Sequence, residues 1–428
     1  MTEEAIRTFL YASIALAALV GAFFFFRWSP KMLMAVWALT LFLIPIWVGV
    51  QAGVFYSAIT VITILVIATS TLKGARLSIV DLLLLTFTVL LIAARLLGWI
   101  TWGHLLIALV GWMVPYLGGR LISSRVAVEW IHTCLAGGAV VASLLAIVEF
   151  LTGFNFFVLL RFPNGIYTTW GTLQYRGGLL RVEGAFGHSI ALGATLAMCS
   201  VFILVARWPL WLRVVSLLVV AIATGLTFSR IGLIGLAITV VVSLILLRRE
   251  ITRALRTAVT VIMAVAAIIG IPLLVDVFTE AGQEAAGSAE YRTDLLSLVH
   301  DMSPLGITSS WDVLPNGETY YGSFQSIDSE LILTGLRFGL IPLLLIIAAL
   351  VCCLIAALRG RATPSSIALI GQIPAFATVA LITQYASVAW FVAGLAVATY
   401  QTSPGIRFSE VPLVASREQH REEQLWLS

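Results

Sequence analysis

Apolar runs of about 20 residues follow one another along almost the whole chain, with short polar connections between them. A run of this length crosses the ~30 Å hydrocarbon layer as one α-helix, because lipid offers no hydrogen-bond partner to an open backbone. Only 11% of the 428 residues are charged, against about 25% in soluble domains. The pattern predicts an all-α polytopic membrane protein with about 12–13 transmembrane helices. The predicted spans are 8–26, 32–50, 54–71, 79–94, 101–119, 126–151, 186–206, 211–228, 231–247, 255–277, 331–357, 365–382 and 387–400.

Lysine and arginine occur mainly in alternate connections, which the positive-inside rule assigns to the cytoplasm. We therefore expect a multi-pass protein of the plasma (inner) membrane, with the N-terminus outside and the C-terminus in the cytoplasm. The N-terminal segment lacks a basic region and a cleavage site, so it is interpreted as the first span and not as a signal peptide. Residues 1–400 are expected to form a single transmembrane domain, and residues 401–428 a short cytoplasmic tail.

Two long loops then fall on the outer face, at about 152–185 and 278–330. The first carries a net charge of +2 and the second a net charge of −8. A basic loop opposite an acidic one suits a ligand with an anionic end and a hydroxyl-rich end. The alternative is that the acidic loop is merely soluble. Loop aromatic residues could stack on sugar rings, although most aromatic residues here are expected in the interfacial belt.

Residues 211–247 form a nearly unbroken apolar stretch that is too long for one crossing. A single helix of this length would measure roughly 55 Å, against ~30 Å of hydrocarbon. We expect a tight outer turn at 228–231, its clearest polar break, which places Arg230 at the membrane boundary. An arginine at membrane depth needs an anion or a water-filled cavity; the alternative is that it extends to the outer headgroups.

Four segments occur in an order that resembles the O-antigen ligase and Wzy-type polysaccharide polymerase family. They are Arg181–Ser189, Thr227–Gly232, Tyr291–Gly306 and Ser326–Ile341. The resemblance covers roughly residues 180–345. It implies a glycosyltransferase of GT-C-like architecture that moves an undecaprenyl-diphosphate-linked glycan on the outer face of the membrane.

The family pattern implies roles for particular residues. Arg181 and Arg230 match the two outer-face arginines that hold the donor diphosphate, and Arg292 matches a loop arginine that shapes the cavity. The segment before the eleventh span often reads His-Asn in ligases and Asp-Asn in polymerases, and here it reads Asp328-Ser329. The missing histidine favours polymerisation over ligation, and the missing asparagine leaves the role of Ser329 open.

Glycosyl transfer from a lipid diphosphate needs stabilisation of the leaving group. Arginine suits this task because its planar guanidinium pairs with phosphate and stays charged. The sequence has no metal-ligand cluster, so we expect a metal-independent mechanism without a cofactor. The acceptor hydroxyl needs a general base, and direct displacement would invert the anomeric centre. The candidate bases, in order, are Asp328, Glu330, His188 and Asp301.

Each candidate also has a structural interpretation. Asp328 or Glu330 could cap the following helix, and His188 could be a satisfied polar residue near a helix start. Glu183 could pair with Arg181 or Arg176.

Three classes of function remain open. The leading hypothesis is a glycan polymerase or ligase, the second is a glycan-lipid flippase or transporter, and the third is a non-catalytic scaffold. A flippase should carry charges through its spans, whereas Asp81, Glu129, Glu149 and Asp276 lie near span ends. The expected partners are the undecaprenyl-diphosphate-linked donor, a glycan acceptor and the bilayer, with a chain-length regulator protein as a candidate and no nucleic acid.

Overall fold

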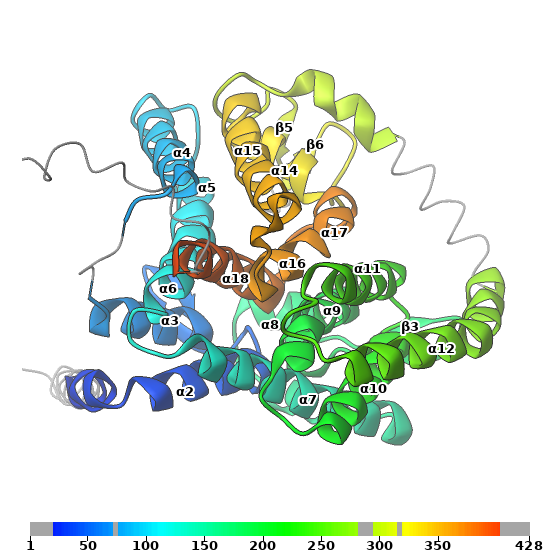
Figure 1. Cartoon of the computed structure of the whole chain (residues 1–428). Helices are drawn as coiled ribbons and strands as arrows, with labels where there is room; N and C mark the ends of the chain where they lie inside the picture. Colours follow the sequence, from blue (N-terminus) through cyan, green and yellow to red (C-terminus); the bar gives the residue numbers. More distant parts are fainter. Residues whose placement is uncertain (1–19, 72–75, 281–293, 315–318, 403–428) are drawn as a thin grey trace, which may run out of the picture.

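The chain folds into a mostly helical structure (Figure 1). The computed structural model describes residues 20–71, 76–280, 294–314 and 319–402. The start of the predicted first span, most of the predicted tail and Arg292 lie outside these ranges. The helices are α2 (Pro30–Leu43), α3 (Ala58–Thr69), α4 (Ile79–Leu96), α5 (Trp102–Leu106), α6 (Val114–Ile122), α7 (Val128–Thr152), α8 (Gly165–Trp170), α9 (Ser189–Val205), α10 (Leu210–Leu226), α11 (Arg230–Leu246), α12 (Arg253–Glu280), α14 (Glu330–Phe338), α15 (Leu340–Ala356), α16 (Pro364–Ile370), α17 (Ile373–Thr378) and α18 (Thr383–Thr402).

Within the described ranges, four helices are long and apolar enough to cross a membrane. They are α4, the continuous helix Trp102–Ile122, α7 and the continuous helix Leu340–Arg361. Helices α2, α3, α9, α10 and α11 are equally apolar but have only 10–17 residues. This composition agrees with an all-α membrane protein, whereas the total number of crossings stays a prediction.

Two predicted spans are broken in the structure. The span 331–357 divides at Gly339, whose φ of 101° suits glycine. The loop before α14 fills the break, since Leu340 N donates to Ser303 O at 2.8 Å. A Cβ on Gly339 would lie 2.7 Å from Leu305 Cα. The span 365–382 divides into the short helices α16 and α17. Hydropathy alone could not locate these breaks because both halves of each span are apolar.

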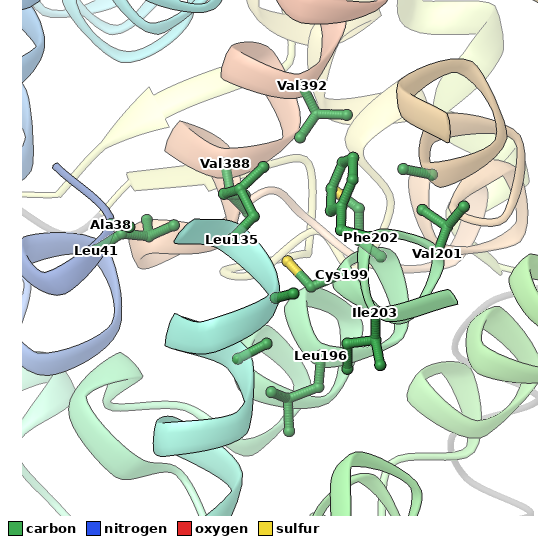
Figure 2. Packing of buried hydrophobic residues seen from close by; sticks show 14 of the residues in the cluster. Ala38, Leu41, Leu135, Leu196, Cys199, Val201, Phe202, Ile203, Val388 and Val392 are labelled. Carbon is green, nitrogen blue, oxygen red and sulfur yellow. The ribbon is translucent and has the colours of Figure 1, made fainter. Parts of the chain in front are cut away.

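Helix α9 is the centre of the hydrophobic core. Every residue from Ala191 to Leu204 is buried, as expected for a helix that is apolar all round. Figure 2 shows α9 side chains such as Phe202 packed among residues of other helices, including Leu135 of α7 and Val392 of α18. Because α9 is packed on all sides, the position of its N-terminal end is fixed. The candidate site begins at this end.

Helices α6 and α18 approach each other at backbone distance because each helix presents a glycine to the backbone of the other. A Cβ on Gly119 would lie 1.8 Å from Phe391 O, and one on Gly394 would lie 1.9 Å from Tyr116 O. Small residues permit such packing between membrane helices. The Phe391 ring then stacks on Trp37 of α2, with ring centroids 3.8 Å apart.

The described residues also contain three short antiparallel hairpins that the all-α prediction did not include. They are β1 (Gly49–Ala52) with β2 (Val54–Ser57), β3 (Gln174–Arg176) with β4 (Leu179–Arg181), and β5 (Trp311–Val313) with β6 (Thr319–Tyr321). Two of them lie in the predicted outer loops, whereas the first replaces the end of the predicted span 32–50 and the start of the predicted span 54–71, so both of those spans are shorter than predicted.

Connections that the sequence assigns to the cytoplasm contact one another. Arg120 donates from Nη2 to Arg76 O and to Gln401 Oε1, both at 2.7 Å. Arg125 donates to the carbonyl oxygen of Arg27. Arg120, near the end of α6, thus joins the connection after α3 to the end of α18, and Arg125 joins the connection after α6 to the segment before α2.

Connections assigned to the outer face likewise contact one another. Gln384 Nε2 donates to Ile44 O and to Ala185 O, each at 2.9 Å. Ile307 N donates to Trp99 O at 3.0 Å. These contacts agree with the predicted alternate crossing of the membrane, because each one joins segments that the prediction places at the same face. Which face is the cytoplasmic one stays a prediction.

Candidate functional site

The β3–β4 hairpin presents two arginines on one face. Its turn consists of Gly177 and Gly178, whose φ angles of 53° and 73° suit the tight turns of hairpins. In the register, Gln174 lies opposite Arg181 and Arg176 lies opposite Leu179. Residues directly opposite each other point to the same side, as do residues two apart in a strand. Arg176 and Arg181 therefore share a face.

That hairpin is bound to the turn between α10 and α11. Arg181 Nε donates to Thr227 O at 3.1 Å, and Arg176 Nη1 donates to Phe228 O at 3.0 Å. The backbone continues this contact, because Val182 N donates to Leu226 O at 3.3 Å. The turn is where the sequence predicted it, since α10 ends at Leu226 and α11 begins at Arg230.

The turn itself is tightly determined. Ser229 caps α11 by accepting from Gly232 N at 3.2 Å. Phe228 has a φ of 47°, which a bulky residue rarely adopts and which its packing must hold in place. Arg230 is exposed as the first residue of α11. The N-terminus of a helix attracts anions, so Arg230 and the first turn of α11 both favour the binding of an anion.

A pair of buried glutamates lies directly behind this face. Glu149 of α7 accepts from Glu183 N at 3.1 Å, from Gly184 N at 2.9 Å and from Asn155 Nδ2 at 3.1 Å. Glu183 is fully buried, and neither of its carboxylate oxygens has a hydrogen-bond partner among the described residues. Of the pairing of Glu183 with Arg181 or Arg176 that the sequence offered as an alternative, the described residues show an electrostatic effect of Arg181 but no hydrogen bond to the carboxyl oxygens.

Burial raises the pKa of Glu183 to about 9. The carboxylate of Glu149 raises it further, whereas the Arg181 guanidinium acts in the opposite direction. Glu183 is consequently protonated at neutral pH, since a buried unpaired charge is far more costly than a neutral carboxyl group.

His188 caps α9. Its Nδ1 accepts from Ile190 N at 3.2 Å, and its ring meets the Trp170 ring edge-on, with centroids 5.7 Å apart. Arg181 acts on the ring electrostatically. A neutral ring that accepts at Nδ1 carries its proton on Nε2. It can donate a hydrogen bond from there, but its lone pair is already used, which does not favour a role as general base.

Glu330 holds α14 against the segment before α18. Its Oε2 accepts from Leu381 N at 2.6 Å, and its backbone N donates to Val379 O at 3.1 Å. Burial raises the pKa of Glu330 to about 7, against the opposing effect of Arg337. The cap of α14 is neither Asp328 nor Glu330 but Ser329, which accepts from Ile332 N at 3.3 Å.

Asp328 and Asp301 are exposed. Ser326 Oγ donates to Asp328 Oδ1 at 3.5 Å, the outer limit of a hydrogen bond. Asp301 ends a short 3₁₀ turn, and its carbonyl oxygen accepts from Thr308 Oγ1 at 2.7 Å. Neither carboxylate is held by a strong structural hydrogen bond in the described part of the chain, so both residues stay candidate bases, with Asp328 at the start of α14.

The structure gathers only part of the predicted site. Arg181 and His188 interact electrostatically, and Arg181 binds the turn that leads into Arg230. Asp328 and Glu330 lie at the start of α14, separated from α11 by α17, which packs against both helices. Sequence reasoning missed Glu149 and Asn155, although an ionisable residue inside a predicted span is itself a signal of function.

No group of three or more His, Cys, Asp or Glu side chains suited to a metal lies within the described part of the chain. Comparison with models of known protein families and with curated protein sequences gives no match. Two features of the chain point to a function. They are the sequence pattern and the arginine cluster, by which we mean Arg176, Arg181 and Arg230.

Proposed function

We propose that the chain is a membrane glycosyltransferase that polymerises, or ligates, undecaprenyl-diphosphate-linked glycan units on the outer face of the plasma membrane. The observation that carries the proposal is the arginine cluster around the turn between α10 and α11. The resemblance of residues 180–345 to O-antigen ligases and Wzy-type polymerases supports it, and implies a GT-C-like architecture.

The cluster suits a diphosphate leaving group. Arg230 is exposed at the start of α11, where the helix dipole also favours an anion. Arg181 is buried, and its bond to Thr227 O orients the guanidinium before any ligand arrives. Fixed cations that neutralise charge developing on a leaving group lower the barrier without reorganising. This is the task that a metal performs in many other transferases.

In the proposed reaction, an acceptor sugar hydroxyl attacks the anomeric carbon of the donor. The bond between that carbon and the diphosphate oxygen breaks, and the diphosphate leaves with its electron pair. Asp328 takes the hydroxyl proton, and the single displacement inverts the anomeric centre. We assign this role to Asp328 over Glu330 and His188, because the latter two already have structural hydrogen bonds.

The test is polymerisation of a defined lipid-linked repeat by the purified chain. Arg230→Ala is expected to leave single repeat units, with activity at least ~100-fold lower, as for loss of an oxyanion-stabilising group. Arg249→Ala is the matched control, since Arg249 is an exposed arginine just beyond the other end of α11. Its activity should equal that of the unmodified chain. Equal activity of Arg230→Ala and Arg249→Ala would refute the assignment of the cluster.

Two further arms test the mechanism. Asp328→Asn should abolish polymerisation, whereas Glu330→Gln should retain most of it, because an amide oxygen can still accept from Leu381 N. EDTA should have no effect if the reaction is metal-independent. A flippase would give another pattern in cells, with variants trapping single units on the inner face.

A further inference from the structure

A cavity of about 590 Å³ opens at the end of the molecule opposite to the arginine cluster. It lies between α4, α15 and α18, and this volume falls within the ~300–1,000 Å³ of typical ligand pockets. Its wall is mostly apolar, and the described residues that form it include two arginines, Arg359 and Arg361, but no carboxylate. Asp81, the acidic residue nearest in sequence to the lining residues of α4, is engaged by Tyr116 OH at 2.6 Å and by Arg120 Nε at 3.3 Å.

The length of the cavity matches one leaflet of a bilayer. Its lining runs along α15 from Ile346 to Ala356, which is roughly ten residues or ~15 Å of helix. Along α18 it runs from Trp390 to Gln401, a similar rise. The hydrocarbon core is ~30 Å thick, so the cavity reaches from one surface to about the middle of the membrane.

The two arginines lie at the surface end of this cavity. Arg361 Nη1 donates to Tyr400 OH at 2.7 Å, and its guanidinium carbon lies 4.1 Å from the centroid of the Tyr400 ring. These two contacts fix the direction of the guanidinium. Arg361 Nε is buried without a hydrogen-bond partner in the described structure, and Arg359 is exposed beside it. A positively charged mouth above an apolar channel complements a molecule with an anionic head and a hydrocarbon tail.

We propose that this cavity binds an anionic phospholipid of the cytoplasmic leaflet, with one acyl chain between α4 and α15 and the phosphate against Arg359 and Arg361. The choice of leaflet follows from the predicted orientation, in which these arginines face the cytoplasm. The site is independent of the proposed transferase reaction. A soluble phosphate would not need the apolar channel, and a neutral lipid would not need the arginines.

The test is native mass spectrometry of the purified full-length chain with added phosphatidylglycerol or phosphatidylcholine of identical acyl chains. We expect the unmodified chain to retain phosphatidylglycerol at least ~10-fold more strongly, because its head group is net anionic, whereas the choline cation offsets the phosphate charge of phosphatidylcholine. The double variant Arg359→Gln/Arg361→Gln should lose this preference. The control Arg248→Gln/Arg249→Gln removes the same charge from another predicted cytoplasmic connection and should keep it.

Two further measurements test the acyl chain and the head group of the lipid separately. Ala349→Trp places a large side chain in the lining and should reduce retention of phosphatidylglycerol although both arginines remain. Water-soluble glycerol 3-phosphate should not displace the lipid. Equal retention of the two lipids by the unmodified chain, an equal loss in the control variant, or displacement by glycerol 3-phosphate would each overturn the proposal.

Discussion

Glu183 opposes folding, because its carboxyl group is buried without a hydrogen-bond partner in the described residues. It nevertheless lies next to the candidate site. A carboxyl group without a hydrogen-bond partner is buried behind three arginines. Its backbone N–H, by contrast, is satisfied by Glu149. The side chains of Glu149 and Asn155 hold the loop in place through hydrogen bonds. The Glu183 side chain makes no such bond in the described residues and is kept neutral beside the proposed anion site.

Stability should consequently depend on pH through Glu183. Its pKa is about 9 in the folded chain, against an ordinary value of 4.5. Between these values the folded state binds the proton and the unfolded state does not, so stability falls as pH rises, by at most about 1.4 kcal/mol per unit. Glu183→Gln should remove most of this slope and be more stable than the parent chain at pH 8. Apparent melting temperatures from pH 5 to 9 measure both effects; equal slopes in the two proteins would show that Glu183 is already ionised.

At the scale of helices and hairpins, the sequence was informative wherever a polar break interrupts an apolar run. The turn at 227–229 was predictable because 211–247 is too long for one crossing and Ser229-Arg230 is its polar point. The divisions at Gly339 and between α16 and α17 were not predictable. They depend on segments far away in the chain, such as the loop that binds at Ser303. The three hairpins were missed for a related reason, since strands of three or four residues leave little periodic signal.

The contact between α6 and α18 provides an element-scale prediction. Gly119→Ala should destabilise the chain by about 1–3 kcal/mol, as overpacking does, because the new Cβ would collide with Phe391 O rather than with a side chain that can move. Gly111→Ala, in the same continuous helix, is the matched control, since a Cβ at Gly111 has no neighbour within 4 Å. Thermal unfolding in detergent compares them. A similar melting temperature for both variants would mean that the two helices pack less closely than the structure shows.

For the molecule as a whole, the sequence predicts two membrane faces. It assigns the arginine cluster and the long loops to one face and most of the basic connections to the other. Of the predicted site, the sequence placed Arg230 at the turn, and the structure adds that Arg181 binds that turn. The sequence could not show that Glu330 and His188 are used in packing. Glu330 accepts from Leu381 N, and His188 accepts from Ile190 N at the start of α9. No pattern in the sequence indicates either contact.

The predicted orientation can be tested by cysteine labelling in intact cells. Thr168→Cys, at an exposed position of the first outer loop, should react with a membrane-impermeant maleimide. Arg249→Cys should react only after the membrane is made permeable. The unmodified chain is the background control, because its four cysteines are buried or only partly exposed. The opposite pattern of labelling would invert the topology and place the arginine cluster in the cytoplasm.

The central claim is that the arginine cluster binds a polyprenyl diphosphate, and a direct binding measurement tests it best. The purified chain should bind undecaprenyl diphosphate more tightly than undecaprenyl monophosphate. Arg230→Ala should weaken binding of the diphosphate at least ~10-fold, whereas Arg249→Ala should leave it unchanged. If Arg230→Ala binds the diphosphate as tightly as the unmodified chain does, the cluster is not its binding site.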